Sequence, residues 1–161
     1  VLPKAKMDCV DIAGMDQIIC AYNQTRVGIN QTFRENLGYG ENPQVGDRIM
    51  CLQNDRNTKV FNGMQGILKS INSYELVMES NGRSYRVPYN PEAFNSEAKP
   101  GYNKLRIPFD YAYCVTAHKS QGDEWDNVLV LEQKCSKWDH RRWAYTAASR
   151  AKKNLVWILD K

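Results

Sequence analysis

Residues 112–126 hold the densest group of side chains in the chain that can contact phosphate. A short apolar stretch, 112–116, is followed at once by a polar run and a glycine. Such a run at the carboxyl end of a parallel strand lies where α/β sheets bind ligands, although a solvated loop is the alternative. Hydroxyl groups and lysine can contact phosphate oxygens, and glycine lets backbone N–H groups approach closely. The residues expected to act in this way are Thr116, His118, Lys119, Ser120 and Gly122.

The acidic run that follows does not predict a metal site. Asp123-Glu124-Trp125-Asp126 spells the acidic pattern that follows a Walker B strand, but Ser-Gln-Gly precedes it instead of four apolar residues. The five cysteines form no Cys-x-x-Cys pair and only two histidines are present, so zinc is not expected either. This use of cysteine is typical of reduced thiols in a cytoplasmic protein.

The polar run needs strands and helices to position it, and the apolar pattern predicts them. Short apolar runs suit buried strands of a parallel sheet. We expect such strands at 17–21, 112–116, 128–131 and 155–159. A helix is expected at 25–37, before Gly38, and a second at 137–152, where four alanines can pack closely on a sheet. The alternation of strand and helix predicts an α/β fold with a parallel sheet.

Between residues 41 and 108 the pattern changes to short β-type runs separated by turns. Asn62-Gly63 and Asn81-Gly82 are hairpin signals, and no helix-length period appears before residue 91. The expected strands are 47–52, 65–71, 75–78 and 84–87. We therefore expect a small β-barrel insert. The predicted domains are 1–41 and 108–161, the two parts of the α/β domain, and 42–107, the insert.

Several segments resemble the sequence motifs of superfamily 1 helicases. Thr116-Ala-His-Lys-Ser-Gln-Gly-Asp-Glu-Trp-Asp is similar to motif V, Tyr145-Thr-Ala-Ala-Ser-Arg-Ala-Lys-Lys to motif VI, and residues 18–30 to motif IV. Residues 45–55 and 60–68 are similar to the SH3-like insert of RecD-type helicases. The chain thus resembles the C-terminal RecA-like domain, 2A, with an SH3-like 2B insert, of a RecD-like, exonuclease V alpha-subunit-type DNA helicase.

This resemblance implies the C-terminal motor half of an ATP-dependent helicase that moves 5′→3′ on single-stranded DNA in repair or recombination. The sequence has no Gly-Lys dipeptide and therefore no P-loop. We therefore expect an N-terminal RecA-like domain of the same parent chain to hold most of the ATP and Mg²⁺. The start without Met fits a piece of a longer protein, and this piece alone should not hydrolyse ATP. Other recombination or repair subunits are further implied partners.

The resemblance also implies roles for individual residues. Arg150 matches the motif VI arginine that reaches a γ-phosphate, although a cation favoured at a helix C-terminus is the alternative. Ser149 stands where the family usually has Thr. The implied nucleotide contacts are Gly122, Glu124 and Gln121. The nucleic-acid contacts are Thr116, His118, Lys119, Ser120, Tyr22 and Asn23, of which Tyr22 either stacks on a base or is simply packed.

Rings and cations in the insert allow two interpretations. They form a face that grips a strand, since aromatic rings stack on bases, or they fill a small barrel core. The rings are Phe61, Tyr74, Tyr85 and Tyr89, and the cations are Arg56, Lys59, Arg83 and Arg86. For Phe61 we expect the core.

The overall charge favours a polyanionic partner weakly. The net charge is +4, and residues 111–161 carry nine basic against six acidic side chains. No apolar run approaches the roughly 18–20 residues that span a bilayer, so no membrane role is expected. No cluster of Asp, Glu and Lys suggests a nuclease. The alternative to a helicase motor is a non-catalytic nucleic-acid-binding module derived from a helicase.

Overall fold

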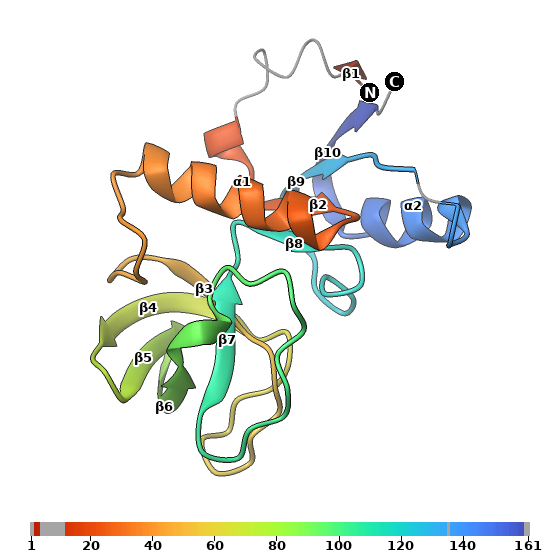
Figure 1. The fold of residues 1–161 in the computed structure, drawn as a ribbon. Coiled ribbons are helices and arrows are strands. Elements are labelled where there is room, and N and C mark those ends of the chain that lie inside the picture. Colours follow the sequence, from red (N-terminus) through yellow and green to blue (C-terminus); the bar gives the residue numbers. More distant parts are fainter. Residues whose placement is uncertain (1, 4–11, 135, 160–161) are drawn as a thin grey trace. The chain divides into compact units, whose positions relative to one another are not determined.

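The computed structural model describes residues 2–3, 12–134 and 136–159 (Figure 1). The chain forms two compact units, which we call unit 1 (Val1–Arg26 with Cys114–Lys161) and unit 2 (Val27–Tyr113). Unit 1 contains a sheet and unit 2 a closed barrel. Within the described part of the chain, no helix combines the length and apolar character needed to cross a membrane.

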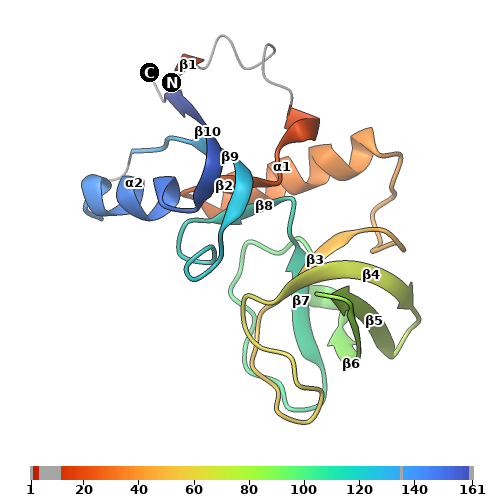
Figure 2. The ribbon, with the colours of Figure 1, turned by 180° about the vertical axis from the view of Figure 1, so that it is seen from behind.

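The sheet of unit 1 has five strands in the order β1-β10-β9-β2-β8, and all of its neighbouring pairs are parallel (Figure 2). Its strands are β1 Leu2–Pro3, β2 Gln17–Cys20, β8 Cys114–Thr116, β9 Trp125–Leu131 and β10 Ala151–Leu159. A short 3-10 turn, Ile12–Gly14, precedes β2. The predicted α/β fold with a parallel sheet is confirmed.

Strand β2 is an interior strand of the sheet, because it pairs with β8 on one side and β9 on the other. All four of its residues are buried, as are the three residues of β8. The apolar run Val128, Leu129 and Val130 in β9 is buried as well. Such runs suit strands that are covered on both faces, which is the usual setting of parallel sheets.

Helix α2, His140–Ala148, is shorter than the predicted helix at 137–152. The Asp139 carboxylate caps its first turn, and Trp143 and Ala147 form its buried face. Trp143 packs edge-to-face on Trp157 of β10, with ring centroids 6.0 Å apart. The expected strand at 155–159 begins four residues earlier, at Ala151, because these residues pair in parallel with β9 and leave the helix.

Unit 2 contains a closed barrel of five strands in the order β3-β4-β5-β6-β7 (Figure 1). The strands are β3 Arg48–Cys51, β4 Gln65–Ile71, β5 Glu75–Ser80, β6 Arg83–Asn90 and β7 Ile107–Tyr111. A 3-10 turn, Pro91–Ala93, follows β6. The predicted barrel insert is confirmed, and its last strand reaches Tyr111. The domain boundaries after residues 41 and 107 stay a prediction.

The barrel encloses an apolar core that includes Leu68, Leu76 and Phe109, all fully buried. The expectation that Phe61 fills this core is wrong: its side chain is 56% exposed. Among the rings named above, Tyr89 packs in the core, since it is only 6% exposed and belongs to the core cluster. Phe61 lies in the loop between β3 and β4, whereas Tyr89 lies in a strand, where alternate side chains point inward.

The hairpin signal at Asn81-Gly82 is confirmed, because these two residues connect β5 to β6. Their φ angles are 49° and 73°, the left-handed values that a two-residue type I′ turn requires. Asn62-Gly63 instead lies inside the long connection between β3 and β4. Gly63 has φ 94° and its N–H donates to the Cys51 carbonyl, so this signal marks a turn but no tight hairpin.

Helix α1, Asn23–Asn36, begins in unit 1 and ends in unit 2. Within unit 2 its Arg34 forms a buried ion pair with Asp47, with Nε 2.9 Å from Oδ1. The Asp47 carboxylate also accepts a hydrogen bond from the Tyr113 hydroxyl. Phe33 stacks on Tyr113 with ring centroids 5.3 Å apart. The end of the helix is thus fixed to the barrel by both charge and ring packing.

Candidate nucleic-acid and nucleotide site

A tight turn leads from the end of β8 into the loop before β9. The Thr116 carbonyl accepts hydrogen bonds from the N–H groups of Lys119 (2.9 Å) and Ser120 (3.1 Å). Gly122 has φ 94°, a conformation that favours glycine. Apart from its chain neighbours, no heavy atom lies within 4 Å of the position a Cβ would take there. The loop backbone is therefore open to close approach at this point.

The predicted phosphate contacts in this turn differ in how exposed their side chains are. His118 is exposed and Lys119 is half-buried, so both side chains can reach a ligand. Thr116 is 9% exposed at the end of its strand. Ser120 is fully buried, and its hydroxyl donates to the Ala117 carbonyl at 2.7 Å. Ser120 therefore shapes the turn, and its side chain does not face a ligand as the sequence led us to expect.

The residues after β2 lie at the same edge of the sheet as Thr116, since the paired strands are parallel. The Tyr22 ring packs on Trp138 with centroids 5.3 Å apart, and its hydroxyl donates to the Lys134 carbonyl. The Gln133 side-chain oxygen accepts hydrogen bonds from the N–H groups of Ala21 and Tyr22. Tyr22 is packed, yet 36% of it stays exposed.

Asn23 begins α1 and is exposed. Its Oδ1 accepts a hydrogen bond from Arg26 Nε at 3.4 Å. Arg26 is only 6% exposed, so it does not present a second arginine to a phosphate at the surface.

The structure divides the predicted site residues between two edges of the sheet. Cys20 pairs with Thr116 at the carboxyl edge, whereas Trp125 pairs with Ala151, next to Arg150, at the amino edge. About six residues of β9 separate the two levels, which corresponds to roughly 20 Å along a strand. The predicted nucleic-acid contacts thus gather at one edge, and Glu124 and Arg150 at the other.

Arg150 lies in the turn after α2, not inside a helix as the sequence predicted. Its half-buried guanidinium donates to the Thr146 carbonyl (3.1 Å), the Asp123 carbonyl (3.2 Å) and the Ser149 hydroxyl (2.8 Å). Its own carbonyl accepts a hydrogen bond from the Trp125 N–H at 2.9 Å. Arg150 therefore ties the turn after α2 to the loop that precedes β9.

The carboxylates near Arg150 differ in their surroundings. Burial raises the pKa of Asp123 above its usual value, and the charge of Arg150 partly opposes that shift. Glu124 is exposed, and its Oε2 lies 3.9 Å from Lys152 Nζ in a pair that contributes little to stability. Asp126 pairs with Lys153 at 2.8 Å, and this hydrogen bond lowers the pKa of the carboxyl.

Trp138 and Arg142 are two pocket residues that were not predicted from the sequence. With His118 and Gln121 they line a pocket of ≈ 330 Å³ between the loop after β8 and the start of α2. The signal that points to them is the run Lys137-Trp-Asp-His-Arg-Arg-Trp, in which aromatic and basic residues lie close together. Such interleaving is typical of single-strand binding surfaces.

A second pocket, of ≈ 510 Å³, lies on the barrel. Its lining includes the cations Lys59, Arg83 and Arg86 and the half-buried ring of Tyr85. Arg86 forms an ion pair with Glu75, while Tyr74 is 74% exposed. The barrel therefore presents positive charge and exposed rings together.

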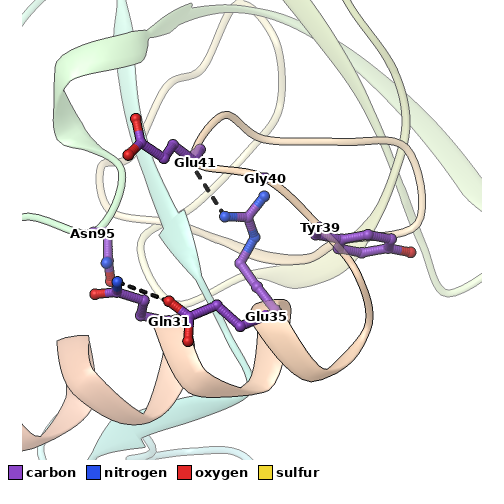
Figure 3. Close-up of a pocket in the computed structure, with 7 residues that line it drawn as sticks. Gln31, Glu35, Tyr39, Gly40, Glu41 and Asn95 are labelled. Carbon is purple, nitrogen blue, oxygen red and sulfur yellow. Dashed lines mark hydrogen bonds between the residues drawn. The ribbon is translucent and has the colours of Figure 1, made fainter.

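A third pocket, of ≈ 400 Å³, is lined from α1, the following loop and Asn95 (Figure 3). On its α1 side, the Gln31 amide donates to the Glu35 carboxylate at 3.0 Å. The charged residues of its lining are Glu35, Glu41 and Arg34, and no predicted site residue belongs to it. Because Arg34 is paired with Asp47, the two glutamates leave the pocket with little attraction for phosphate.

The described residues contain no group of three or more His, Cys, Asp or Glu side chains arranged to hold a metal ion. Cys20, Cys51 and Cys114 are buried thiols, and burial raises the pKa of Cys114. Cys9 and Cys135 lie outside the described residues.

Comparison with known proteins relates this chain to helicases. Residues 111–158 match the UvrD-like helicase C-terminal domain. An uncharacterized protein of Methanocaldococcus jannaschii is 30% identical over 146 residues, covering 79% of this chain. The ATP-dependent RecD2 DNA helicase of Deinococcus radiodurans is 29% identical over 108 residues, covering 66% of this chain. This chain spans only 12% and 13% of the lengths of these two relatives.

Solved structures share the fold at low sequence identity. A Bacteroides Pif1 helicase in complex with ADP-AlF3 and ssDNA has a TM-score of 0.63 and 19% identity, covering 89% of this chain and 42% of that chain. The Pif1 helicase of Candida albicans has a TM-score of 0.58 and 16% identity, covering 95% of this chain and 47% of that chain. The sequence matches support a superfamily 1 helicase C-terminal domain, and the solved structures share its fold.

Proposed function

We propose that this chain is the C-terminal motor half of a RecD-like, ATP-dependent DNA helicase that moves 5′→3′ on single-stranded DNA. The observation that carries the proposal is the link between Arg150 and the loop after β8. The Arg150 guanidinium donates to the Asp123 carbonyl, and its carbonyl accepts from Trp125. The residue proposed to sense nucleotide is thus bonded to the loop whose other end is proposed to contact the strand.

On the nucleotide side, Arg150 acts on the γ-phosphate of ATP held by an N-terminal RecA-like domain of the parent protein. A planar guanidinium binds phosphoryl oxygens in bidentate fashion and stabilises the charge that develops on them. The open backbone at Gly122 and the exposed Gln121 and Glu124 provide further contacts at the nucleotide's edge. Mg²⁺ is held by the other domain.

On the nucleic-acid side, Thr116, His118 and Lys119 contact phosphates of a single strand at the carboxyl edge of the sheet. Tyr22 and Asn23 flank them at the end of β2. The SH3-like barrel carries its own basic pocket, which is a further place where positive charge can attract a nucleic acid. Likeness to Pif1 bound to ssDNA and to the RecD2 DNA helicase supports DNA as the polymer. Recombination or repair subunits are the further proposed partners.

One observation favours a second candidate, a non-catalytic nucleic-acid-binding module. All three donors described for Arg150 already have acceptors within this chain. A purely structural arginine would have the same surroundings. In the motor interpretation, the γ-phosphate replaces one of these neutral acceptors, which a charged oxygen does with a stronger hydrogen bond.

ATP hydrolysis by the longer parent protein distinguishes the two functions. We expect Arg150→Ala to lower DNA-stimulated turnover by about 10³-fold or more while single-strand binding is retained. Arg150→Lys should recover little, because an ammonium cannot reproduce the bidentate fork. Arg141→Ala, which removes an exposed arginine near the other end of α2, is the matched control. Near-normal turnover of Arg150→Ala would show that Arg150 is a structural residue and would contradict the motor interpretation. A wild-type parent protein without DNA-stimulated turnover would establish the non-catalytic module.

A further inference from the structure

The pocket between the loop after β8 and α2 has no part in the contacts proposed above, apart from His118 and Gln121 on its rim. Its volume of ≈ 330 Å³ is at the small end of ligand pockets, which measure about 300–1,000 Å³. It is lined by Ala117, His118, Gln121, Trp138, Asp139, Arg142, Trp143 and Thr146. All of these residues belong to unit 1.

Two aromatic rings, Trp138 and Trp143, line this pocket. The Trp138 ring rests on Tyr22 with centroids 5.3 Å apart and an interplanar angle of 43°. Trp143, only 5% exposed, stacks on His140 at 5.8 Å and 20°. Rings that are held from behind lose little conformational freedom when a planar ligand packs on them.

Trp138 also carries an unused polar atom. Its Nε1 is buried, and no acceptor for it is found among the described residues. A base that packs on the face of this ring therefore displaces no hydrogen bond of the indole within the described structure.

Polar and cationic side chains also line this pocket. The side chains of His118, Gln121 and Arg142 are exposed, and the described structure gives none of them a hydrogen-bond partner. Arg142 lies one residue after Arg141 in the first turn of α2. Planar aromatic packing beside donors and a positive charge suits a heterocycle attached to a phosphodiester.

We infer that this pocket receives one unpaired nucleobase of the bound single strand, which packs on Trp138 beside Arg142. The inference rests on the proposed function, because the strand path along Thr116 and His118 brings bases to the pocket's rim. The volume of ≈ 330 Å³ is large enough for one base. Ring stacking is tolerant of sequence, so the pocket accepts any of the four bases.

Abasic substitution in an oligonucleotide tests the inference with the chain itself. We expect one abasic position in a dodecamer to weaken binding to the wild-type chain by about tenfold, within the range of 1–3 kcal/mol per stacked base. Trp138→Ala should weaken binding of the intact strand by a similar factor, and the abasic position should then cost nothing further. Trp138→Phe, which keeps a ring, should retain most of the affinity.

Two matched controls share the helix but not the pocket. Tyr145→Ala removes a 76% exposed ring from α2, and it should leave the abasic profile unchanged. Arg141→Ala should lower affinity evenly for intact and abasic strands, whereas Arg142→Ala should reduce the difference between them. Melting curves and near-ultraviolet circular dichroism verify that each variant is folded.

The outcomes separate the pocket from the proposed function. If the chain binds the strand but every abasic strand equally well, the pocket inference is wrong and phosphate binding stands. If Trp138→Ala and Tyr145→Ala give the same abasic profile, the base lies elsewhere. If free deoxynucleosides compete for the pocket as strongly as an oligonucleotide does, the ligand is a free nucleoside and not a strand. No strand binding at low salt would overturn both proposals.

Discussion

The Arg150 guanidinium has acceptors within its own chain and is also proposed to bind a phosphate. Three neutral acceptors of its own chain hold it, including the Ser149 hydroxyl. A half-buried arginine with these contacts is held near one geometry, which lowers the entropy lost when a phosphate replaces one acceptor.

Asp123 gives this region a pH dependence. Burial raises its pKa above the usual 3.8, so the folded state binds the proton more tightly than the unfolded state does. Stability from this source is present below pH 3.8 and is lost as the pH rises through the folded pKa. Asp123→Asn should therefore raise the melting temperature at pH 7 and change it little at pH 3.

Asp126, at the start of β9, provides a control whose pKa is shifted in the opposite direction. Its pKa is lowered by the hydrogen bond from Lys153, so its contribution is present above pH 3.8 and is lost as the pH falls through the folded pKa. Asp126→Asn should lower the melting temperature at pH 7 and not at low pH. Equal effects of the two substitutions at pH 7 would contradict this account.

At the scale of elements, the ion pair between α1 and the barrel makes a strong prediction. Asp47 is fully buried and Arg34 is 4% exposed, so removing one partner leaves an uncompensated buried charge. Asp47→Asn should cost about 3–5 kcal/mol, measured by urea unfolding and by hydrogen exchange of the barrel amides. Glu79→Gln removes the acid of an exposed pair with Lys69 and should cost about 1 kcal/mol or less. Similar losses of stability in both variants would show that the buried pair contributes no more to stability than the exposed pair does.

Two glycines of the same unit should respond to alanine in opposite ways. At Gly66, in β4, a Cβ would overlap the Glu79 carbonyl and the Met78 side chain. At Gly28, inside α1, a Cβ meets nothing within 4 Å and the φ angle is ordinary. Gly28→Ala should stabilise the chain by up to about 1 kcal/mol, and Gly66→Ala should destabilise the barrel. Thermal unfolding of both variants checks the signs, and a stable Gly66→Ala barrel would contradict the packing.

Most strands could be predicted because their signals are local. The expected 65–71 coincides with β4, and Asn81-Gly82 forms the expected hairpin turn. The helix predicted at 137–152 is present but shorter, His140–Ala148, because residues from Ala151 onward join the sheet. Pairing of Ala151 with Trp125 ends the helix, and no local pattern reveals a partner 26 residues away.

The whole molecule should bind single strands weakly and with a small salt dependence. Its net charge is +4, and the proposed phosphate contacts are few. The slope of log K against log salt should be about −0.7 per phosphate contact. Replacing Thr116 and His118 together by alanine should reduce both affinity and slope, measured by fluorescence anisotropy. An unchanged slope in that double variant would place the strand elsewhere.

The candidate site was predictable only where a motif held its residues together. Thr116 to Glu124 form one loop, so the sequence alone identified the run. The sheet order then placed Tyr22 and Trp138 against each other across more than a hundred residues, which no spacing shows. Burial of the Ser120 side chain was equally hidden, because a serine in a polar run looks the same whether it faces solvent or the turn.

The central claim is that Arg150 couples nucleotide to strand binding. Its most direct test is the affinity of the longer parent protein for a single-stranded oligonucleotide, with and without a non-hydrolysable ATP analogue. Coupling of 1–3 kcal/mol predicts that the analogue changes the wild-type Kd by about 5–150-fold. Arg150→Ala should keep the nucleotide-free Kd and lose this change, whereas Arg141→Ala should keep the change that the analogue causes. If Arg150→Ala retained the full wild-type change, Arg150 would be a structural residue and the motor assignment would be contradicted.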